Sequence, residues 1–251
     1  MLRVITVIGL FVLCLCGRTM ADSATVAVAS NFKATLQQLQ PAFEQQTGHQ
    51  LTLVSAASGT LYQQIRFGAP FDLLFSADSE RPRQLALSGH GVANSRRTYA
   101  LGQLALAGHE LSLSQTIDHN LQALKGKLAL ANPRHAPYGK AAQQSLEHLS
   151  LAERLAGQQV LGTNVLQAYQ FVTTGNAELG LVAMALLKQD SQAPNYLLIP
   201  SLWHQPIEQQ LILLQHGQDN TAAKALLTFM KSSYARQLVA SDGYLLPEAD
   251  Q

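Results

Sequence analysis

The stretch that decides the fold is TVAVASNFKATLQQLQPAFEQQTGHQLTLVSAASGT, residues 25–60. It opens with an apolar run at 25–29, which predicts a buried strand. The apolar residues that follow are separated by four, three and four positions, which is helical spacing: Phe32, Leu36, Leu39 and Phe43. Gly48 ends this helix, because glycine readily takes the left-handed conformation of a helix C-terminus, and a second strand follows at 51–54. A strand–helix–strand unit of this kind is the building block of α/β folds.

The same alternation of apolar runs and amphipathic segments continues along the chain. Further buried strands are expected at 71–75, 99–107, 127–131, 180–184, 196–199 and 207–214. Amphipathic helices are expected around Leu61, Leu146 and Tyr169, and a last one over 221–239. The alternation predicts an α/β fold with mostly parallel strands.

The length and the connections of the chain indicate two lobes. At 251 residues the chain is long enough for one large or two modest domains, and it has no internal repeat or long flexible linker. Short connections imply that the chain crosses between two compact units more than once. We place the first lobe at 22–100 and 208–251, and the second at 101–207.

The composition excludes several classes of protein. Hydrophobic residues make up 47% of the chain and charged residues 13%, which is typical of a globular protein and not of a disordered or fibrous one. The 17 basic and 16 acidic residues give a formal net charge of +1. Nothing in this balance marks a surface for nucleic acid or for an anionic membrane.

The N-terminus has the three parts of a secretory signal peptide. Arg3 precedes an uncharged run at 4–16, and 19–21 (Thr-Met-Ala) resembles a cleavage site. The run is shorter than the ~20 apolar residues that a membrane span needs. Both cysteines, Cys14 and Cys16, leave with this segment, so the mature protein has no disulfide framework, and the sequence around Cys16 is a poor context for a lipid anchor. We therefore expect cleavage near Ala21 and a soluble periplasmic protein.

Four segments place small or hydroxyl residues between a strand or turn and the start of a helix. They are 29–31 (ASN), 57–60 (ASGT), 136–139 (APYG) and 162–165 (GTNV). Each would bring unpaired backbone N–H groups to the positive end of a helix dipole, where anions bind. The simpler explanation is that Ser30, Ser58 and Thr163 only cap their helices. Four such segments in one α/β chain favour binding, because loops at the carboxyl ends of strands converge on a ligand crevice.

None of these four segments contains a charged residue. An anion bound there would be held by neutral donors, and each charge-assisted hydrogen bond contributes about 1.5–3 kcal/mol. Without an acidic acceptor, the O–H of a protonated anion such as hydrogen phosphate would find no partner. We infer that a fully deprotonated tetrahedral dianion fits best.

Sequence signatures of catalysis are weak. Ser58 lies in Ala-Ala-Ser-Gly-Thr, which is not a nucleophile elbow, and the sequence has no phosphate-binding loop, dinucleotide fingerprint or zinc-protease motif. Of eight scattered histidines only His135 is near a candidate loop, where we expect it to be solvated or to brace the loop. Asp72 and Asp78 flank a strand end and are expected to cap the segment that follows. Tyr138 is either a pocket wall and hydroxyl donor or a packing residue.

Five segments, spread over essentially the whole mature chain, carry the most specific pattern: 26–32 (VAVASNF), 58–61 (SGTL), 68–78 (GAPFDLLFSAD), 132–139 (NPRHAPYG) and 164–165 (NV). In this order they resemble the molybdate-binding periplasmic proteins of ABC transporters. The resemblance implies a two-lobed type II periplasmic binding fold. Each lobe would then be a mixed, mostly parallel sheet flanked by helices.

The resemblance also implies a ligand and its donors. One tetrahedral oxyanion, molybdate and also tungstate, would lie between the lobes, held by hydroxyls and backbone N–H groups. The matching positions are Ser30 with Asn31 beside it, Ser58, Tyr138 and the backbone of Val165. Some family members add a tyrosine hydroxyl where this chain has Ala183, and we expect Asn31 and Tyr138 to replace that donor. No cofactor and no bare metal cation is implied.

The expected function is that of a monomeric solute-binding protein, not an enzyme, that hands its anion to an inner-membrane ABC permease. Another tetrahedral oxyanion such as sulfate, in the same fold, is the alternative, because the size of the cavity decides between them. An exported hydrolase that uses Ser58 would lack every expected motif. A ferric-binding relative would need clustered tyrosine, histidine and carboxylate ligands, and only Tyr138 and His135 qualify.

Overall fold

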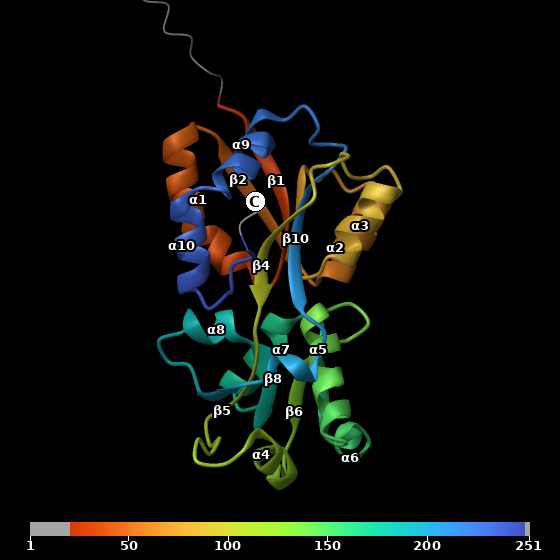
Figure 1. The fold of residues 1–251 in the computed structure, drawn as a ribbon, viewed down its shortest axis with the longest axis vertical. Coiled ribbons are helices and arrows are strands. Elements are labelled where there is room, and N and C mark those ends of the chain that lie inside the picture. The colour runs from red at the N-terminus through yellow and green to blue at the C-terminus, as the bar shows by residue number, and fades with distance from the viewer. Residues whose placement is uncertain (1–20, 249–251) are drawn as a thin grey trace, which may run out of the picture.

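The computed structural model describes residues 21–248 and contains two five-stranded sheets, one in each of two lobes that follow one another along the long axis of the molecule (Figure 1). The predicted export signal lies, except for Ala21, outside the described residues. Both sheets combine parallel and antiparallel pairs and are flanked by helices. The expected two-lobed α/β fold is confirmed.

The first sheet has the strand order β2-β1-β3-β10-β4. Its strands are β1 (Ser23–Ala29), β2 (Gln50–Ala56), β3 (Leu73–Ser76), β4 (Arg97–Gly102) and β10 (Ile207–Leu213). The strand β1 runs parallel to β2 and β3, whereas β10 is antiparallel to β3 and β4. Parallel strands end at the same edge of a sheet, so the loops after β1, β2 and β3 lie together at the edge nearest the second lobe.

Helices cover both faces of the first sheet (Figure 1). On one face lie α1 (Lys33–Thr47), α9 (Thr221–Phe229) and α10 (Ser233–Ser241), and on the other α2 (Ser58–Arg66) and α3 (Glu80–Leu87). The four apolar residues that predicted α1 are all completely buried. Gly48 ends that helix with a φ of 73°, and its N–H donates to the carbonyl of Glu44, as the sequence predicts.

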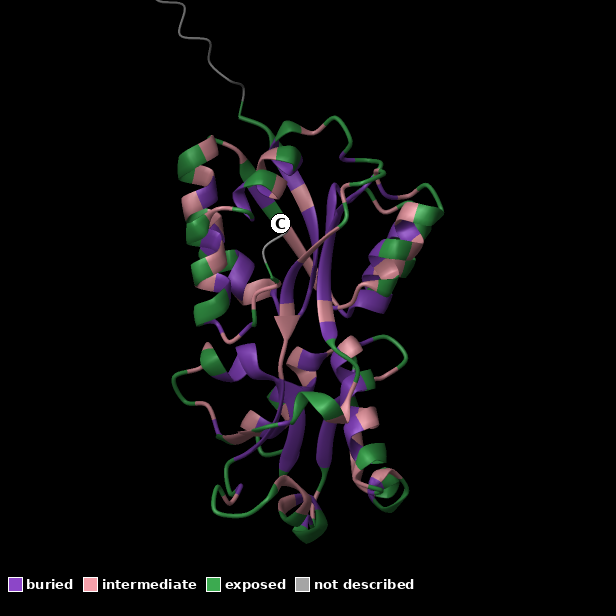
Figure 2. Cartoon of the chain, in the orientation of Figure 1, coloured by how far each residue is buried: buried purple, intermediate pink, exposed green. Residues whose placement is uncertain are grey.

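The second sheet has the strand order β7-β6-β8-β5-β9. Its strands are β5 (Leu104–Gly108), β6 (Leu128–Ala131), β7 (Gln159–Gly162), β8 (Leu179–Ala183) and β9 (Asn195–Leu198). Its α-helices are α4 (Ile117–Ala123), α5 (Pro137–His148), α6 (Ala152–Leu155), α7 (Val165–Thr173) and α8 (Met184–Lys188). Two short 3₁₀ turns complete the lobe at Ala156–Gln158 and Ser201–Trp203. Its central strands are buried throughout (Figure 2).

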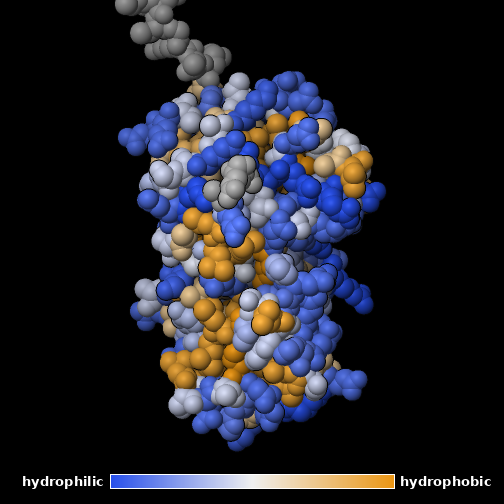
Figure 3. Space-filling view, in the orientation of Figure 1, coloured by the Kyte–Doolittle hydropathy of each residue, from blue (hydrophilic) through white to orange (hydrophobic). Residues whose placement is uncertain are grey.

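Apolar side chains are not confined to the interior. Figure 3 shows them gathered on one face around the junction of the lobes and over the second lobe. Inside, the largest buried cluster is centred on the second sheet and also takes in Ala29, Ala57 and Ala77, which lie at the ends of first-lobe strands. The two lobes are therefore in direct apolar contact at the place where those strands end.

The single strand expected at 99–107 is wrong. The chain leaves the first sheet at Gly102 and joins the second at Leu104, so Gln103 alone separates β4 from β5. The Gln103 side-chain amide donates to the backbone carbonyl of Gly243 (2.8 Å). The Gln103 backbone carbonyl accepts from the backbone N–H of Met184 (2.9 Å). The exact lobe limits, 22–100 with 208–251 and 101–207, stay a prediction.

The single final helix expected at 221–239 is also wrong. It divides into α9, which ends at Phe229, and α10, which begins at Ser233. Ser232 starts the second helix, because its hydroxyl accepts a hydrogen bond from the N–H of Ala235 (3.2 Å). Serine at this position satisfies a free helix donor, and this local bond outweighs the continuous apolar spacing.

The buried face of α1 generates a test of the fold. Phe43 is completely buried and packs edge-on against Phe229, with ring centroids 5.6 Å apart. We expect Phe43→Ala to lower the free energy of unfolding by about 3–5 kcal/mol, because it leaves a cavity between α1 and α9. Urea unfolding measures this. Phe67→Ala is the matched control, since Phe67 is 87% exposed, and it should change stability by less than about 0.5 kcal/mol. Equal losses in both variants would contradict the packing described here.

Candidate functional site

The five residues predicted to form the site all line one small cavity between the lobes. About 180 Å³ of space free of protein atoms lies here, part of it open to solvent, and the other walls are alanine and proline: Ala29, Ala57, Ala77, Ala136 and Pro137. Ser30, Asn31, Ser58, Tyr138 and Val165 are each at least 95% buried. No lining residue is charged. Ala183 is buried at the end of β8 and does not line the cavity.

Three helices begin at this cavity without a capping side chain. The residues before α1, α2 and α5 are Phe32, Ala57 and Ala136, and none makes a side-chain cap bond. By contrast Thr116, Asn220 and Ser232 cap α4, α9 and α10 with side-chain oxygens. The first N–H groups of α1, α2 and α5 therefore have no local side-chain acceptor, which is the condition for binding an anion.

The simpler explanation of the serines and threonine as helix caps is wrong. Neither serine is in a capping position: Ser30 lies two residues before Phe32, which precedes α1, and Ser58 is the first residue of α2. At the fourth segment the cap of α7 is Asn164, whose side chain accepts from the N–H of Gln167 (3.0 Å), whereas Thr163 is exposed. Val165 is the first residue of α7 and the part of this segment that reaches the cavity.

The Ser58 hydroxyl is held in one direction. Its oxygen accepts a hydrogen bond from the backbone N–H of Ala77 (2.9 Å), and the side chain is 1% exposed. A hydroxyl that accepts from an amide keeps its own proton for another partner. Because Ser58 lines the cavity, its O–H is available as a donor there.

Tyr138 is the second residue of α5 and is 1% exposed. Its hydroxyl accepts from the side-chain amide of Gln209 on β10 (3.1 Å), a contact between the lobes. Burial raises the pKa of Tyr138 well above its usual value, so the hydroxyl keeps its proton. Gly139 allows this placement, because a Cβ there would collide with the carbonyl of Ala131 on β6. Tyr138 is thus both a wall of the cavity and a hydroxyl in position to donate.

A buried polar network lies behind the cavity, and the sequence did not predict it. The Gln209 side-chain oxygen accepts from the Asn31 amide (2.9 Å) and from the Tyr99 hydroxyl (3.0 Å). The Asn31 amide also donates to Tyr244 (3.1 Å). The Asn31 side-chain amide is therefore engaged by the protein, and the backbone N–H is what Asn31 can offer a ligand. The available signal was the polar run Glu208-Gln209-Gln210 inside the β10 strand, in which Gln209 is completely buried.

The two tyrosines of this network pack against the ring of Phe32. Phe32 has its ring centroid 4.5 Å from that of Tyr99, 5.4 Å from that of Tyr244 and 5.7 Å from that of Phe75. Tyr99 and Tyr244 are both buried, and burial raises the pKa of both tyrosines well above the usual value. All the hydroxyls of the network therefore stay neutral in any ordinary buffer.

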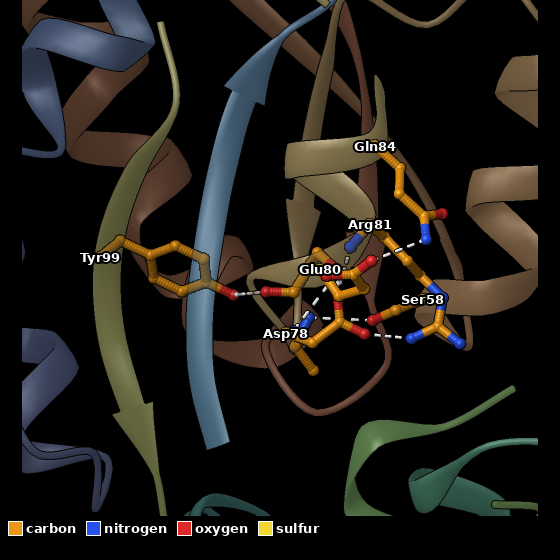
Figure 4. A network of polar contacts seen from close by, with 8 residues as sticks. Ser58, Asp78, Glu80, Arg81, Gln84 and Tyr99 are labelled. Carbon is orange, nitrogen blue, oxygen red and sulfur yellow. Dashed lines mark hydrogen bonds and ion pairs between the residues drawn. The ribbon is translucent and has the colours of Figure 1, made fainter. Parts of the chain in front are cut away.

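The carboxylate near the cavity is neutralised by its neighbours. Asp78 accepts from the Arg81 backbone N–H (3.0 Å) and the Ser76 hydroxyl (3.1 Å), and it pairs with the Arg81 guanidinium. Figure 4 shows Arg81 reaching back to Asp78 beside Ser58. The bond to the Arg81 N–H at the start of α3 confirms that Asp78 caps the segment after the strand.

The expectation for Asp72 is wrong. Its carboxylate is buried and accepts from the N–H of Thr25 at the start of β1 (2.7 Å), and it contacts the ring of His216 (2.9 Å). It joins the first strand to the loop after β10 and does not cap the segment that follows it. The cause is tertiary, since the two partners are 47 and 144 residues away in sequence.

One backbone contact closes the lobes over the cavity. The N–H of Gly59, on α2, donates to the carbonyl of His135 in the second lobe (2.8 Å), while the His135 side chain is exposed. The contact needs glycine, because a Cβ at position 59 would lie 2.9 Å from both the Cα and the carbonyl oxygen of His135. A larger hollow of about 1190 Å³ adjoins the cavity, with Arg81, Arg134 and Lys140 among its lining residues.

Two further properties bear on the kind of site. Among the side chains that the structure describes, no three histidine, cysteine, aspartate or glutamate residues are grouped as they would be around a metal ion. Within residues 21–248, no helix combines the length and apolar character needed to cross a membrane.

Comparison with known proteins gives consistent matches. The family model for bacterial extracellular solute-binding proteins matches residues 24–245. The molybdate-binding protein ModA of Azotobacter vinelandii is 38% identical over 230 residues, 89% of this chain and 90% of that protein. ModA of Rhodobacter capsulatus is 35% identical over 228 residues, 90% of this chain and 89% of that protein.

Solved structures agree with this result. The periplasmic molybdate-binding protein of Azotobacter vinelandii superposes with a TM-score of 0.85 at 34% identity, over 90% of this chain and 100% of that chain. The sulfate-binding protein SubI of Mycobacterium tuberculosis has a TM-score of 0.75 at 14% identity, over 90% and 88%, which shows a shared fold alone. The chain therefore belongs to the family of bacterial extracellular solute-binding proteins, together with these molybdate-binding relatives.

Proposed function

We propose that this protein binds molybdate as the dianion in the cavity between the lobes and delivers it to an ABC permease in the inner membrane. The observation that carries the proposal is the cavity itself, which is buried, has no charged side chain and gathers hydroxyls with the uncapped starts of three helices. Neutral donors aimed at one point suit an anion that carries no proton. The molybdate-binding proteins named above support the choice of anion.

The proposed donors are the residues predicted from the sequence. The Ser58 and Tyr138 hydroxyls donate directly, since each already accepts an amide N–H from the protein. The Ser30 hydroxyl and the backbone N–H groups of Asn31 and Val165 complete the set. Several such bonds, each of about 1.5–3 kcal/mol, offset the cost of removing a dianion from water.

Tungstate is the second ligand that we propose, because it has the same charge and tetrahedral shape. Sulfate is the alternative oxyanion, and the structural likeness to a sulfate-binding protein does not extend to a related sequence. The hydrolase is not favoured, since Ser58 donates its hydrogen bond into a cavity that no histidine lines.

The cellular setting follows from the same proposal. We propose that the segment ending near Ala21 directs export to the periplasm and is removed, and that the mature protein acts as a monomer. Binding drives closure of the lobes, and the closed shape is the form that the permease recognises. No chemical step on the ligand is part of this function.

Stabilisation by ligands tests the choice of anion. At 100 times its dissociation constant a ligand adds about 2.7 kcal/mol to the free energy of unfolding. For a protein of this size we expect molybdate and tungstate to raise the melting temperature by about 5–10 °C at constant ionic strength. Sulfate and phosphate serve as controls and should change it little. No shift with any of the four anions would refute the proposal, and a shift with sulfate alone would favour the alternative.

Removing the two hydroxyls tests the donors. We expect Ser58→Ala and Tyr138→Phe each to weaken molybdate binding about tenfold to a hundredfold, because each removes one charge-assisted hydrogen bond. Titration calorimetry on the mature protein measures the dissociation constants. The controls are Ser191→Ala and Tyr234→Phe, which change exposed side chains and should leave affinity unchanged. Wild-type affinity in both site variants would remove these hydroxyls from the proposed donor set.

The glycine at the lobe contact tests closure separately from ligand contact. We expect Gly59→Ala to weaken binding at least tenfold, because its Cβ would hold α2 away from His135. The ligand-free protein should not lose stability, since alanine favours helix over glycine by about 1 kcal/mol. The matched control is Gly157→Ala, where an added Cβ meets nothing within 4 Å. Unchanged affinity in Gly59→Ala, measured by the same titration, would show that this contact has no part in closure.

A further inference from the structure

The network behind the cavity fixes the orientation of the Asn31 and Gln209 side-chain amides, and this can be followed from the Tyr244 hydroxyl. The Tyr244 hydroxyl donates to the backbone carbonyl of Asn31 (2.8 Å), which is only an acceptor. Its oxygen can then only accept from the Asn31 side chain, so the group that faces it, at 3.1 Å, is the amide NH₂. The orientation of Asn31 is thus set by a main-chain carbonyl.

The orientation of Gln209 follows from that of Asn31. The second hydrogen of the Asn31 amide is directed at Gln209, 2.9 Å away, so Gln209 must present its oxygen on that side. The same oxygen accepts from the Tyr99 hydroxyl (3.0 Å), which is also within 3.3 Å of the Ser76 carbonyl. The other end of Gln209 is therefore the NH₂ group, and it donates to the Tyr138 oxygen at 3.1 Å. Gln209 is completely buried, at a register shift in β10 between Gln209 and Gln210.

We propose that Gln209 is a positioning residue, because its amide holds the Tyr138 hydroxyl so that Tyr138 presents a proton, and not a lone pair, to the bound anion. This inference rests on the proposed function. Gln209 does not line the cavity and acts through Tyr138. The Ala77 N–H does the same for Ser58. Both hydroxyls are thus set as donors by protein amides, and the cavity rejects an anion whose own O–H would need an acceptor.

A single substitution can reverse this polarity. In Gln209→Glu the introduced carboxylate still accepts from Asn31 and Tyr99, but it also accepts from Tyr138, whose proton then turns away from the cavity. When the pH falls and the carboxyl gains a proton, it donates to Tyr138 as the amide does, and the Tyr138 proton returns to the ligand. The titratable groups in contact are Tyr99 and Tyr138, with Tyr244 next to them, and all three stay neutral. Asp78 is the carboxylate whose charge contributes to the raised pKa of Tyr99, and it is paired with Arg81.

The test compares four full-length mature proteins: wild type, Gln209→Glu, Tyr138→Phe and the double variant. Molybdate dissociation constants are measured by calorimetry at pH 8 and pH 6, each as a ratio to wild type at the same pH, which removes titration of the ligand. We expect Gln209→Glu to bind about tenfold to a hundredfold more weakly at pH 8, and the deficit to shrink at pH 6. In the Tyr138→Phe background the same change should bring no pH-dependent deficit.

The inference is overturned if the deficit of Gln209→Glu is the same at both pH values, or if it persists unchanged without the Tyr138 hydroxyl. If Gln209→Glu does not fold at pH 8, Gln209→Met replaces it, because methionine fills a similar space and has no N–H to donate to the Tyr138 hydroxyl. It should weaken binding in the wild-type background and not in Tyr138→Phe, and equal losses in the two overturn the inference. A wild type that binds no molybdate refutes the proposed function itself, whereas a binding wild type with pH-independent variants refutes only the role of Gln209.

Discussion

The structure depends on the need to satisfy backbone N–H groups that are buried at helix starts. An α-helix leaves its first N–H groups without internal partners, and burying them unpaired is costly. Here α1, α2 and α5 begin with Phe32, Ala57 and Ala136, none of which supplies an oxygen. These helices come from both lobes and meet at one cavity. The N–H of Gly59 in α2 donates to the His135 carbonyl, and the proposed oxyanion would supply oxygen acceptors for the remaining N–H groups.

The residues around the cavity do not supply side-chain acceptors for the N–H groups at the starts of α1, α2 and α5. Small residues form its walls, so no long side chain can fold in and cap the helices. The carboxylate of Asp78, next to Ala77 of the cavity wall, is held by Arg81 and Ser76. The buried rings of Phe32, Tyr99 and Tyr244 pack together around the polar network. The dipoles of the helices that begin here favour an anion, although the cavity is lined by no positive side chain.

Much of this architecture could be predicted from local patterns. The spacing from Phe32 to Phe43 and the glycine at 48 predicted α1 correctly, because both are properties of neighbouring residues. Five candidate site residues were found from loop composition and family likeness, and all five reach the cavity. Patterns of this kind do not report partners far apart in sequence. Gln209 lies 178 residues from Asn31, and Asp72 lies 144 from His216. The crossing at Gln103 was missed because two apolar strands in different sheets look like one in the sequence.

That crossing has a mechanical consequence. Since one residue separates β4 from β5, the two sheets share a joint whose movement is confined to the torsion angles around Gln103, together with the longer return segment at 199–206. Gln103 is also tied to Gly243 on one side and Met184 on the other. We infer that a joint with so few free torsion angles restricts the lobes to a small range of relative orientations. Little orientational entropy is then lost when they come together, and more of the interaction energy remains as affinity.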